Sequence, residues 1–135
     1  MAASTRRHIE IDGPRAARRA RREVRRLVRE AARAGGPVGR TAEDDAALVV
    51  TEVVTNAVRH GGGARVLELV AGPDGLDIVV TDRNTRLPHL RRPSLAGDGG
   101  HGLAIVARLA DAVTTCGPAG PGEGKAVHVH LPLSS

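Results

Sequence analysis

Aromatic side chains are absent from this chain of 135 residues, which contains no Phe, Tyr or Trp. The interior must therefore be filled by Leu, Val, Ile and Ala, and a base-stacking platform for single-stranded nucleic acid cannot be built. Cysteine occurs once, as Cys116, which excludes an internal disulfide and fits a reducing cytoplasm. No apolar run has membrane-spanning length, and no apolar segment follows the N-terminal charges as in a secretory signal. We expect one domain, residues 1–135, in a cytoplasmic protein without a membrane anchor.

Positive charge is concentrated near the N-terminus. The formal net charge is +5, but residues 1–33 hold eleven arginines against four acids, whereas residues 34–135 hold nine basic and eleven acidic side chains. Residues 14–34 are predicted to form an amphipathic helix with nine arginines around an apolar stripe of Ala20, Val24, Leu27, Val28 and Ala31. This helix indicates either an anionic partner, such as DNA or a membrane, or a solvated face held by Arg19/Glu23 and Arg26/Glu30 pairs. The absence of a second basic element favours the solvated face.

A buried helix is predicted at residues 42–60, with Thr41 as its N-cap and Asp44 three residues further on. Glu52 and Asn56 lie four residues apart, so a carboxylate and a carboxamide share one side of this helix, next to its apolar stripe. Such an oxygen pair suits a hydrated Mg²⁺ ion and its phosphates, although a surface Glu and a satisfied buried Asn explain it as well. The apolar stripe comprises Ala47, Val50, Val54, Ala57 and Val58.

Short strands are predicted before and after this helix. In the strand at residues 76–82, Asp82 has the same parity as the apolar Ile78 and Val80, so its carboxylate should point toward the core. A buried carboxylate needs a partner, which the protein or a ligand supplies. The other predicted elements are strands at residues 7–11, 64–71, 112–116 and 125–133 and a helix at residues 102–111.

Residues 83–101 are predicted to form a loop of unusual length, which indicates a functional lid or disorder. Gly97, Gly99 and Gly102 match G-x-G-x-x-G, but the dinucleotide fingerprint must follow a strand, so we reject a Rossmann fold. Gly99, Gly100 and Gly102 directly before a helix either present backbone N–H groups to an anion or form a flexible connector.

Three further patterns have simple structural explanations. Gly124-Lys125 resembles the end of a P-loop, but the first glycine and the final hydroxyl of that motif are missing. His128 and His130 share the outer face of the last strand and are predicted to be solvent-exposed, because a zinc site needs a fuller ligand set. Cys116 is predicted to be a small core residue rather than a nucleophile.

Four motifs in this order carry a family resemblance: Glu52 to Asn56, Asp82 at a strand end, the stretch Gly99-Gly-His-Gly102-Leu, and Gly124-Lys125 before the last strand. Together they resemble the GHKL ATPase superfamily of gyrase, heat-shock chaperones and histidine kinases, over about residues 9–133. The spacing is most similar to the anti-sigma-factor-like serine/threonine kinases of bacteria. The resemblance implies the Bergerat ATP-binding fold, an α/β two-layer sandwich of a mixed, mainly antiparallel sheet with helices on one face.

The resemblance also implies the roles of individual residues. Asn56 would bind Mg²⁺, Glu52 would be the catalytic base, and Asp82 would accept the adenine amino group. Residues 1–13 would be an N-terminal strand region, and residues 83–101 would be the ATP lid. The glycines that usually follow the adenine-binding aspartate are replaced here by Arg83-Asn84-Thr85. The complete set implied to bind ATP is Asn56, Arg59, His60, Asp82, Asn84, Gly99, Gly100, His101, Gly102, Leu103 and Lys125.

The function implied is an ATP- and Mg²⁺-dependent serine/threonine protein kinase in a bacterial partner switch. Its partners would be an anti-anti-sigma-type antagonist, a sigma factor or both, and the resemblance allows a homodimer; neither a membrane nor nucleic acid is expected as a partner. Two alternatives remain. One is a nucleotide-sensing protein-binding module without catalysis, and the other is a DNA-associated protein that uses the arginine helix.

Overall fold

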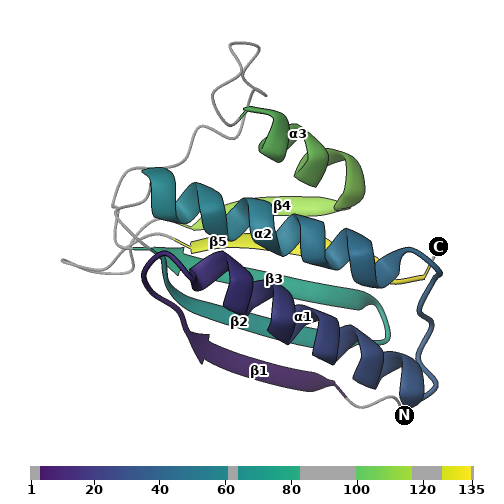
Figure 1. The fold of residues 1–135 in the computed structure, drawn as a ribbon. Coiled ribbons are helices and arrows are strands. Elements are labelled where there is room, and N and C mark those ends of the chain that lie inside the picture. The colour runs from purple at the N-terminus through teal and green to yellow at the C-terminus, as the bar shows by residue number, and fades with distance from the viewer. Residues whose placement is uncertain (1–3, 61–63, 83–99, 117–125, 135) are drawn as a thin grey trace.

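The computed structural model of the protein describes residues 4–60, 64–82, 100–116 and 126–134 (Figure 1). All the predicted helices and strands are present, and the ends of most of them differ from the prediction by one or two residues. In chain order the elements are β1 (Thr5–Glu10), α1 (Ala16–Arg33), α2 (Ala42–His60), β2 (Ala64–Gly72), β3 (Gly75–Asp82), α3 (Gly100–Leu109), β4 (Ala112–Cys116) and β5 (Ala126–Leu131).

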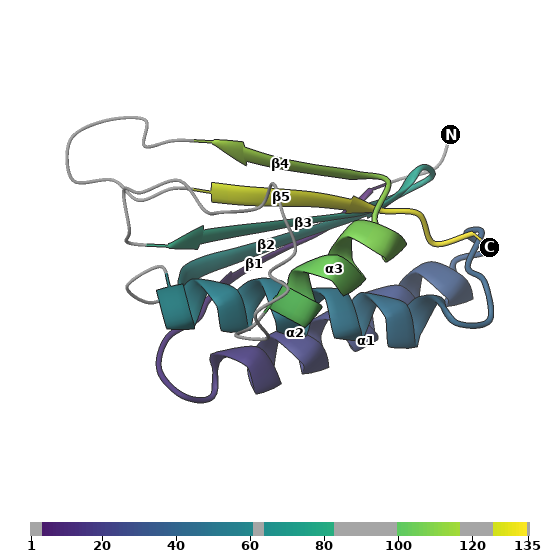
Figure 2. The ribbon, with the colours of Figure 1, turned by 90° about the horizontal axis from the view of Figure 1, so that it is seen from above.

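The five strands form one sheet in the order β1-β2-β3-β5-β4. Each of the four pairings between these strands is antiparallel. The three helices cover one face of the sheet, with α2 between α1 and α3 (Figure 2). The predicted two-layer α/β sandwich with helices on one face is therefore confirmed, but the expected mixed sheet is antiparallel in every described pairing.

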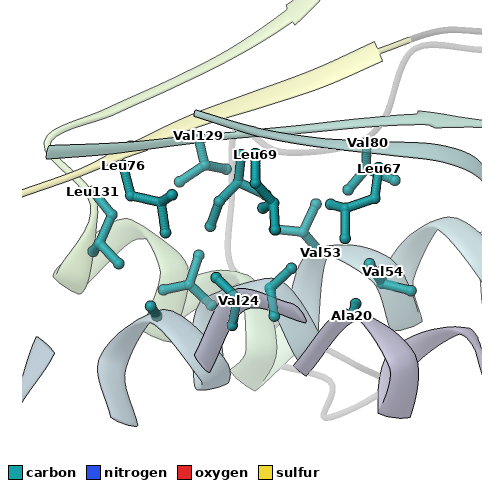
Figure 3. Packing of buried hydrophobic residues seen from close by; sticks show 14 of the residues in the cluster. Ala20, Val24, Val53, Val54, Leu67, Leu69, Leu76, Val80, Val129 and Leu131 are labelled. Atoms are coloured by element: carbon teal, nitrogen blue, oxygen red, sulfur yellow. The ribbon is translucent and has the colours of Figure 1, made fainter. Parts of the chain in front are cut away.

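The core lies between the sheet and the helices (Figure 3). Alternate residues of β2, β3 and β5 point into it, among them Leu69, Ile78 and Val129, because period-two alternation puts every second side chain on the helical face. The predicted stripe of α1 is buried over Ala20, Val24, Leu27 and Val28, and Ala31 packs against it.

The buried side of α2 is wider than the predicted stripe. Val49 and Val53 are buried as well, because α2 contacts both α1 and α3 in addition to the sheet. The prediction of a buried Val58 is wrong, since this side chain is 41% exposed. It follows the buried Ala57 in the last turn of α2, and the step of about 100° per residue turns it away from the sheet.

The predicted Arg19/Glu23 and Arg26/Glu30 ion pairs of α1 are wrong, because these side chains have other partners. Glu23 pairs with Arg26 at 3.7 Å, and Glu30 pairs with Arg7 of β1 at 2.7 Å. Arg19 donates to the carbonyl of Glu10 at 2.9 Å. These side chains find partners on β1 or at a different helical spacing, which sequence distance within α1 does not reveal.

Thr41 immediately precedes α2, as predicted, and its carbonyl accepts the N–H of Asp45 at 2.9 Å. Its hydroxyl donates to the Asp45 carboxylate at 2.9 Å, whereas Asp44 binds Arg25 of α1 at 3.0 Å. Asp44 therefore connects two helices rather than completing a cap. None of the helices in the described ranges is both long and apolar enough to cross a bilayer.

Candidate functional site

The predicted site residues lie around the C-terminal part of α2, the end of β3 and the start of α3. In Figures 1 and 2, α2 and β3 finish at the same end of the sheet, and α3 runs in the opposite direction to α2. The first turn of α3 is therefore directed toward the end where α2 and β3 finish. Segments that are far apart in the sequence converge here because the sheet order brings β3 beneath α2, against which α3 packs.

Glu52 and Asn56 are partly buried on α2. The side of the helix that they occupy follows from Glu43, which faces α1 and forms ion pairs with Arg25 at 3.2 Å and with Arg29 at 2.8 Å. Glu52 lies nine positions after Glu43, which corresponds to a rotation of about 180° from the side that faces α1. Asn56 lies one turn further along, roughly 140° from that side. In Figure 2, α2 lies between α1 and α3. The helical rotation therefore places both residues on the side of α2 toward α3.

Asp82 ends β3 and is only 2% exposed, so the predicted inward orientation is confirmed. Its neighbour across the sheet is Ala64, the first residue of β2, next to a register shift between Ala64 and Val66. Each buried side-chain nitrogen and oxygen within the described ranges has a hydrogen-bonding partner. The other residues of β3 that point toward the helices, Leu76, Ile78 and Val80, are apolar, so Asp82 is the one buried carboxylate on this face of the strand.

The first turn of α3 contains Gly100, His101, Gly102 and Leu103. The helix begins two residues earlier than predicted, so these residues supply the backbone N–H groups that have no partner inside the helix. A helix N-terminus also carries partial positive charge, which favours an anion. Gly100 and Gly102 therefore lie in the first turn of a helix and not in a connector before it.

The remaining predicted site residues are placed less fully. Arg59 is exposed in the last turn of α2, which ends at His60. The side chains of His60, His101 and Leu103 lie outside the described part of the chain, as do all atoms of Asn84, Gly99 and Lys125 and the remainder of the predicted lid at residues 83–99.

The described residues provide three kinds of nucleotide contact. Glu52 and Asn56 offer the oxygen ligands that Mg²⁺ prefers. The first turn of α3 offers N–H groups to phosphate oxygens. Asp82 offers a buried acceptor for an N–H donor such as the amino group of a base. The described residues therefore have the groups that a nucleotide carrying Mg²⁺ needs.

Two histidine pairs were missed by the sequence analysis, and both lie away from these residues, on the sheet face opposite the helices. His128 of β5 contacts Asp77 of β3 at 2.9 Å, and His130 contacts Asp111 at 2.6 Å. The histidines are on the outer face as predicted, but they are partly buried and not fully solvent-exposed, and each has a carboxylate partner. The shared outward parity of Asp77, His128 and His130 was the available signal, although it required knowledge that β3 and β5 are neighbours.

Comparison with known proteins gives one result that covers most of the chain. Residues 14–128 match the family model described as histidine kinase-like ATPase domain. No curated protein matches the chain. The match supports ATP binding, in agreement with the residues around α2, β3 and α3. This chain therefore belongs to the histidine kinase-like ATPase domain family of the GHKL superfamily.

Proposed function

We propose that this protein is an ATP- and Mg²⁺-dependent protein kinase of the anti-sigma-factor-like type, which phosphorylates a serine or threonine of an antagonist protein in a bacterial partner switch. The observation that carries the proposal is the position of Glu52 and Asn56, one helical turn apart on the side of α2 toward α3. Nucleotide binding alone requires a metal ligand such as the Asn56 carboxamide at this position, but it does not require a carboxylate one turn away from it.

In this proposal each residue has one task. Asn56 holds the metal through its carboxamide oxygen, Asp82 orients the adenine by accepting an N–H bond, and the backbone N–H groups of residues 100–103 bind phosphate oxygens. Bound Mg·ATP supplies the γ-phosphoryl group together with metal charge that offsets the negative charge of the phosphates.

Glu52 takes the proton of the attacking hydroxyl. A bond forms between the serine oxygen of the antagonist and the γ-phosphorus while the bond from that phosphorus to the bridging oxygen breaks, and ADP leaves. A base in this position is worth about 10²–10⁴-fold in rate. The partner is then released or captured according to its phosphorylation, which would make the chain a switch.

A second candidate is a nucleotide-sensing module that binds a protein partner without catalysis. It is favoured by one feature of the sequence, namely that Arg83-Asn84-Thr85 stands where related kinases have glycines directly after Asp82. In this alternative Asn56 and Asp82 keep their tasks, and Glu52 needs no chemical role.

One experiment distinguishes the two candidates by measuring both the capture of a partner protein and the transfer of phosphate from ATP to that partner. The protein is immobilised, and antagonist-type proteins encoded in the same genome are applied with ATP, with ADP or without nucleotide. The proteins that bind are identified. Phosphate transferred from γ-labelled ATP is then mapped to a residue of the bound protein. Phosphate on a single serine or threonine supports the kinase. Nucleotide-dependent capture without transfer supports the binding module, and neither capture nor transfer with ATP bound would contradict both.

A further inference from the structure

Helix α1 presents a continuous arginine face. It contains eight arginines, and at about 100° per residue they occupy an arc of about 160° on the side opposite the buried residues. The two glutamates of α1, Glu23 and Glu30, lie just outside one edge of this arc, and the only other residue within the arc is Ala32. The arginine face consists of Arg18, Arg19, Arg21, Arg22, Arg25, Arg26, Arg29 and Arg33.

Part of this charge is used inside the molecule. Arg25 and Arg29 form ion pairs with residues at the start of α2, and Arg26 lies 3.7 Å from Glu23. Arg18, Arg22 and Arg33 are exposed and form no ion pair with any other residue of the described ranges. These three side chains lie within about 60° of one another around α1, with about one turn between Arg18 and Arg22 and about three turns between Arg22 and Arg33.

The composition of the face limits what can bind to it. A protein interface has an apolar centre, and the arginine face offers no large apolar side chain. Stable membrane attachment needs an apolar anchor in addition to basic residues, whereas the apolar stripe of α1 is buried against the sheet and α2. The phosphate backbone of duplex DNA differs from both, because charge neutralisation alone supplies nearly all of its non-specific binding.

We propose that the arginine face binds the phosphate backbone of duplex DNA without reading its sequence. From Arg18 to Arg33 the helix spans about 23 Å at 1.5 Å per residue, which corresponds to roughly thirteen phosphate charges of a duplex. The guanidinium fork forms bidentate bonds with phosphate oxygens, and the face carries no lysine. The chain lacks aromatic residues, so the proposal excludes base stacking. It concerns α1 alone and does not depend on the activity proposed for the nucleotide site.

The test compares two triple variants that each remove three positive charges. One carries Arg18→Gln, Arg22→Gln and Arg33→Gln on the arginine face. The other carries Arg6→Gln, Arg40→Gln and Arg108→Gln, three exposed arginines outside it. Binding to fluorescein-labelled 24-base-pair duplexes of two unrelated sequences is followed by anisotropy between 50 and 200 mM salt. Circular dichroism verifies that both variants remain folded.

The parent should bind both sequences equally, with an affinity that falls steeply with salt. Loss of three phosphate contacts should reduce the slope of log K against log salt by about 2.7, which corresponds to several hundred-fold weaker binding at 0.1 M salt. The control variant should lose less than about tenfold, because its charges lie outside the arginine face and are screened by salt. Equal losses in the two variants, or no binding of the parent at 50 mM salt, would refute the proposal. Tighter binding to phosphatidylserine vesicles than to the duplex would assign the face to membranes instead.

Discussion

His130 and Asp111 are joined at two points, one between side chains and one between backbones. The Nδ1 atom of His130 lies 2.6 Å from Oδ1 of Asp111, and the N–H of Asp111 donates to the carbonyl of His130 at 3.0 Å. The hydrogen bond to Asp111 raises the pKa of His130 above its ordinary value, against an opposing effect of burial, and the charges of Asp111, Asp77 and Asp74 add to the increase. The junction between α3 and β4 is therefore fixed to β5 by a bond that strengthens when His130 is protonated.

This pair predicts a pH-dependent contribution to stability. Because the pKa of His130 is raised in the folded state, the contribution is fully present below the unfolded value of about 6.5 and is lost as pH rises through the folded value. Asp111→Asn should therefore reduce the free energy of unfolding by about 0.5–1 kcal/mol at pH 5.5 and by clearly less at pH 9. Urea unfolding of parent and variant at both pH values measures this difference. An equal loss at pH 5.5 and pH 9 would show that the charge of His130 does not contribute.

Gly75 is predicted to be irreplaceable at the hairpin between β2 and β3. It has φ +130°, and a Cβ atom there would lie 2.5 Å from the carbonyl oxygen of Leu131, which is backbone and cannot swing away. Gly35 provides the matched control, since it has φ +88° but nothing within 4 Å of an added Cβ. Gly35→Ala should cost about 1 kcal/mol for backbone conformation alone, and Gly75→Ala about 3 kcal/mol or more. Similar unfolding free energies for the two variants would contradict the steric argument.

The parts of the fold that sequence alone predicted are those governed by local periodicity. The bounds of α2 were correct because its apolar spacing is strong and it ends at glycines. The burial of Asp82 was correct because parity in a strand depends only on the chain itself. Asp82 and the Glu52/Asn56 pair could therefore be proposed as site residues from sequence.

The parts that sequence did not predict depend on neighbours distant in the chain. Glu30 pairs with Arg7 of β1 and not with Arg26 of its own helix. The position of α1 relative to β1 decides between these two partners. The partner of His128 is decided by the pairing of β5 with β3, which joins residues 51 positions apart. The start of α3 at Gly100 was missed because the glycines that permit a close approach to an anion also weaken the helical signal.

Asp82 is predicted to select adenine nucleotides. A buried carboxylate accepts the amino N–H of adenine, whereas guanine presents a carbonyl oxygen at that position and would be repelled. Asp82→Asn should weaken ATP binding by about 1.5–3 kcal/mol in calorimetry, the scale of a hydrogen bond to a charged group. Asp77→Asn, on the opposite face of β3, is the matched control and should leave ATP affinity unchanged. Undiminished ATP affinity of Asp82→Asn, or equal affinity of the parent for GTP, would contradict the assignment.

Glu52 and Asn56 are predicted to fail in different ways when they are changed. Asn56→Ala removes the proposed metal ligand, so Mg²⁺-dependent ATP binding and phosphoryl transfer should be lost together. Glu52→Gln keeps the size and hydrogen-bonding ability of the side chain but removes the base, so ATP affinity should be retained while transfer falls about 10²–10⁴-fold. Calorimetry in the presence and absence of Mg²⁺ measures the first quantity, and labelled transfer to the antagonist protein measures the second.

The antagonist must be present in these transfer assays, because a kinase of this type acts on a protein hydroxyl and not on water. Thr51→Ser, on the same helix, is a suitable control, since its hydroxyl bonds to the carbonyl of Ala47 at 2.6 Å and the substitution preserves that bond. Raising the pH should not restore transfer by Glu52→Gln, because an amide has no proton-accepting form in the accessible range. Transfer by Glu52→Gln at the parental rate would remove Glu52 from the mechanism and leave Asn56 as a residue for nucleotide binding alone.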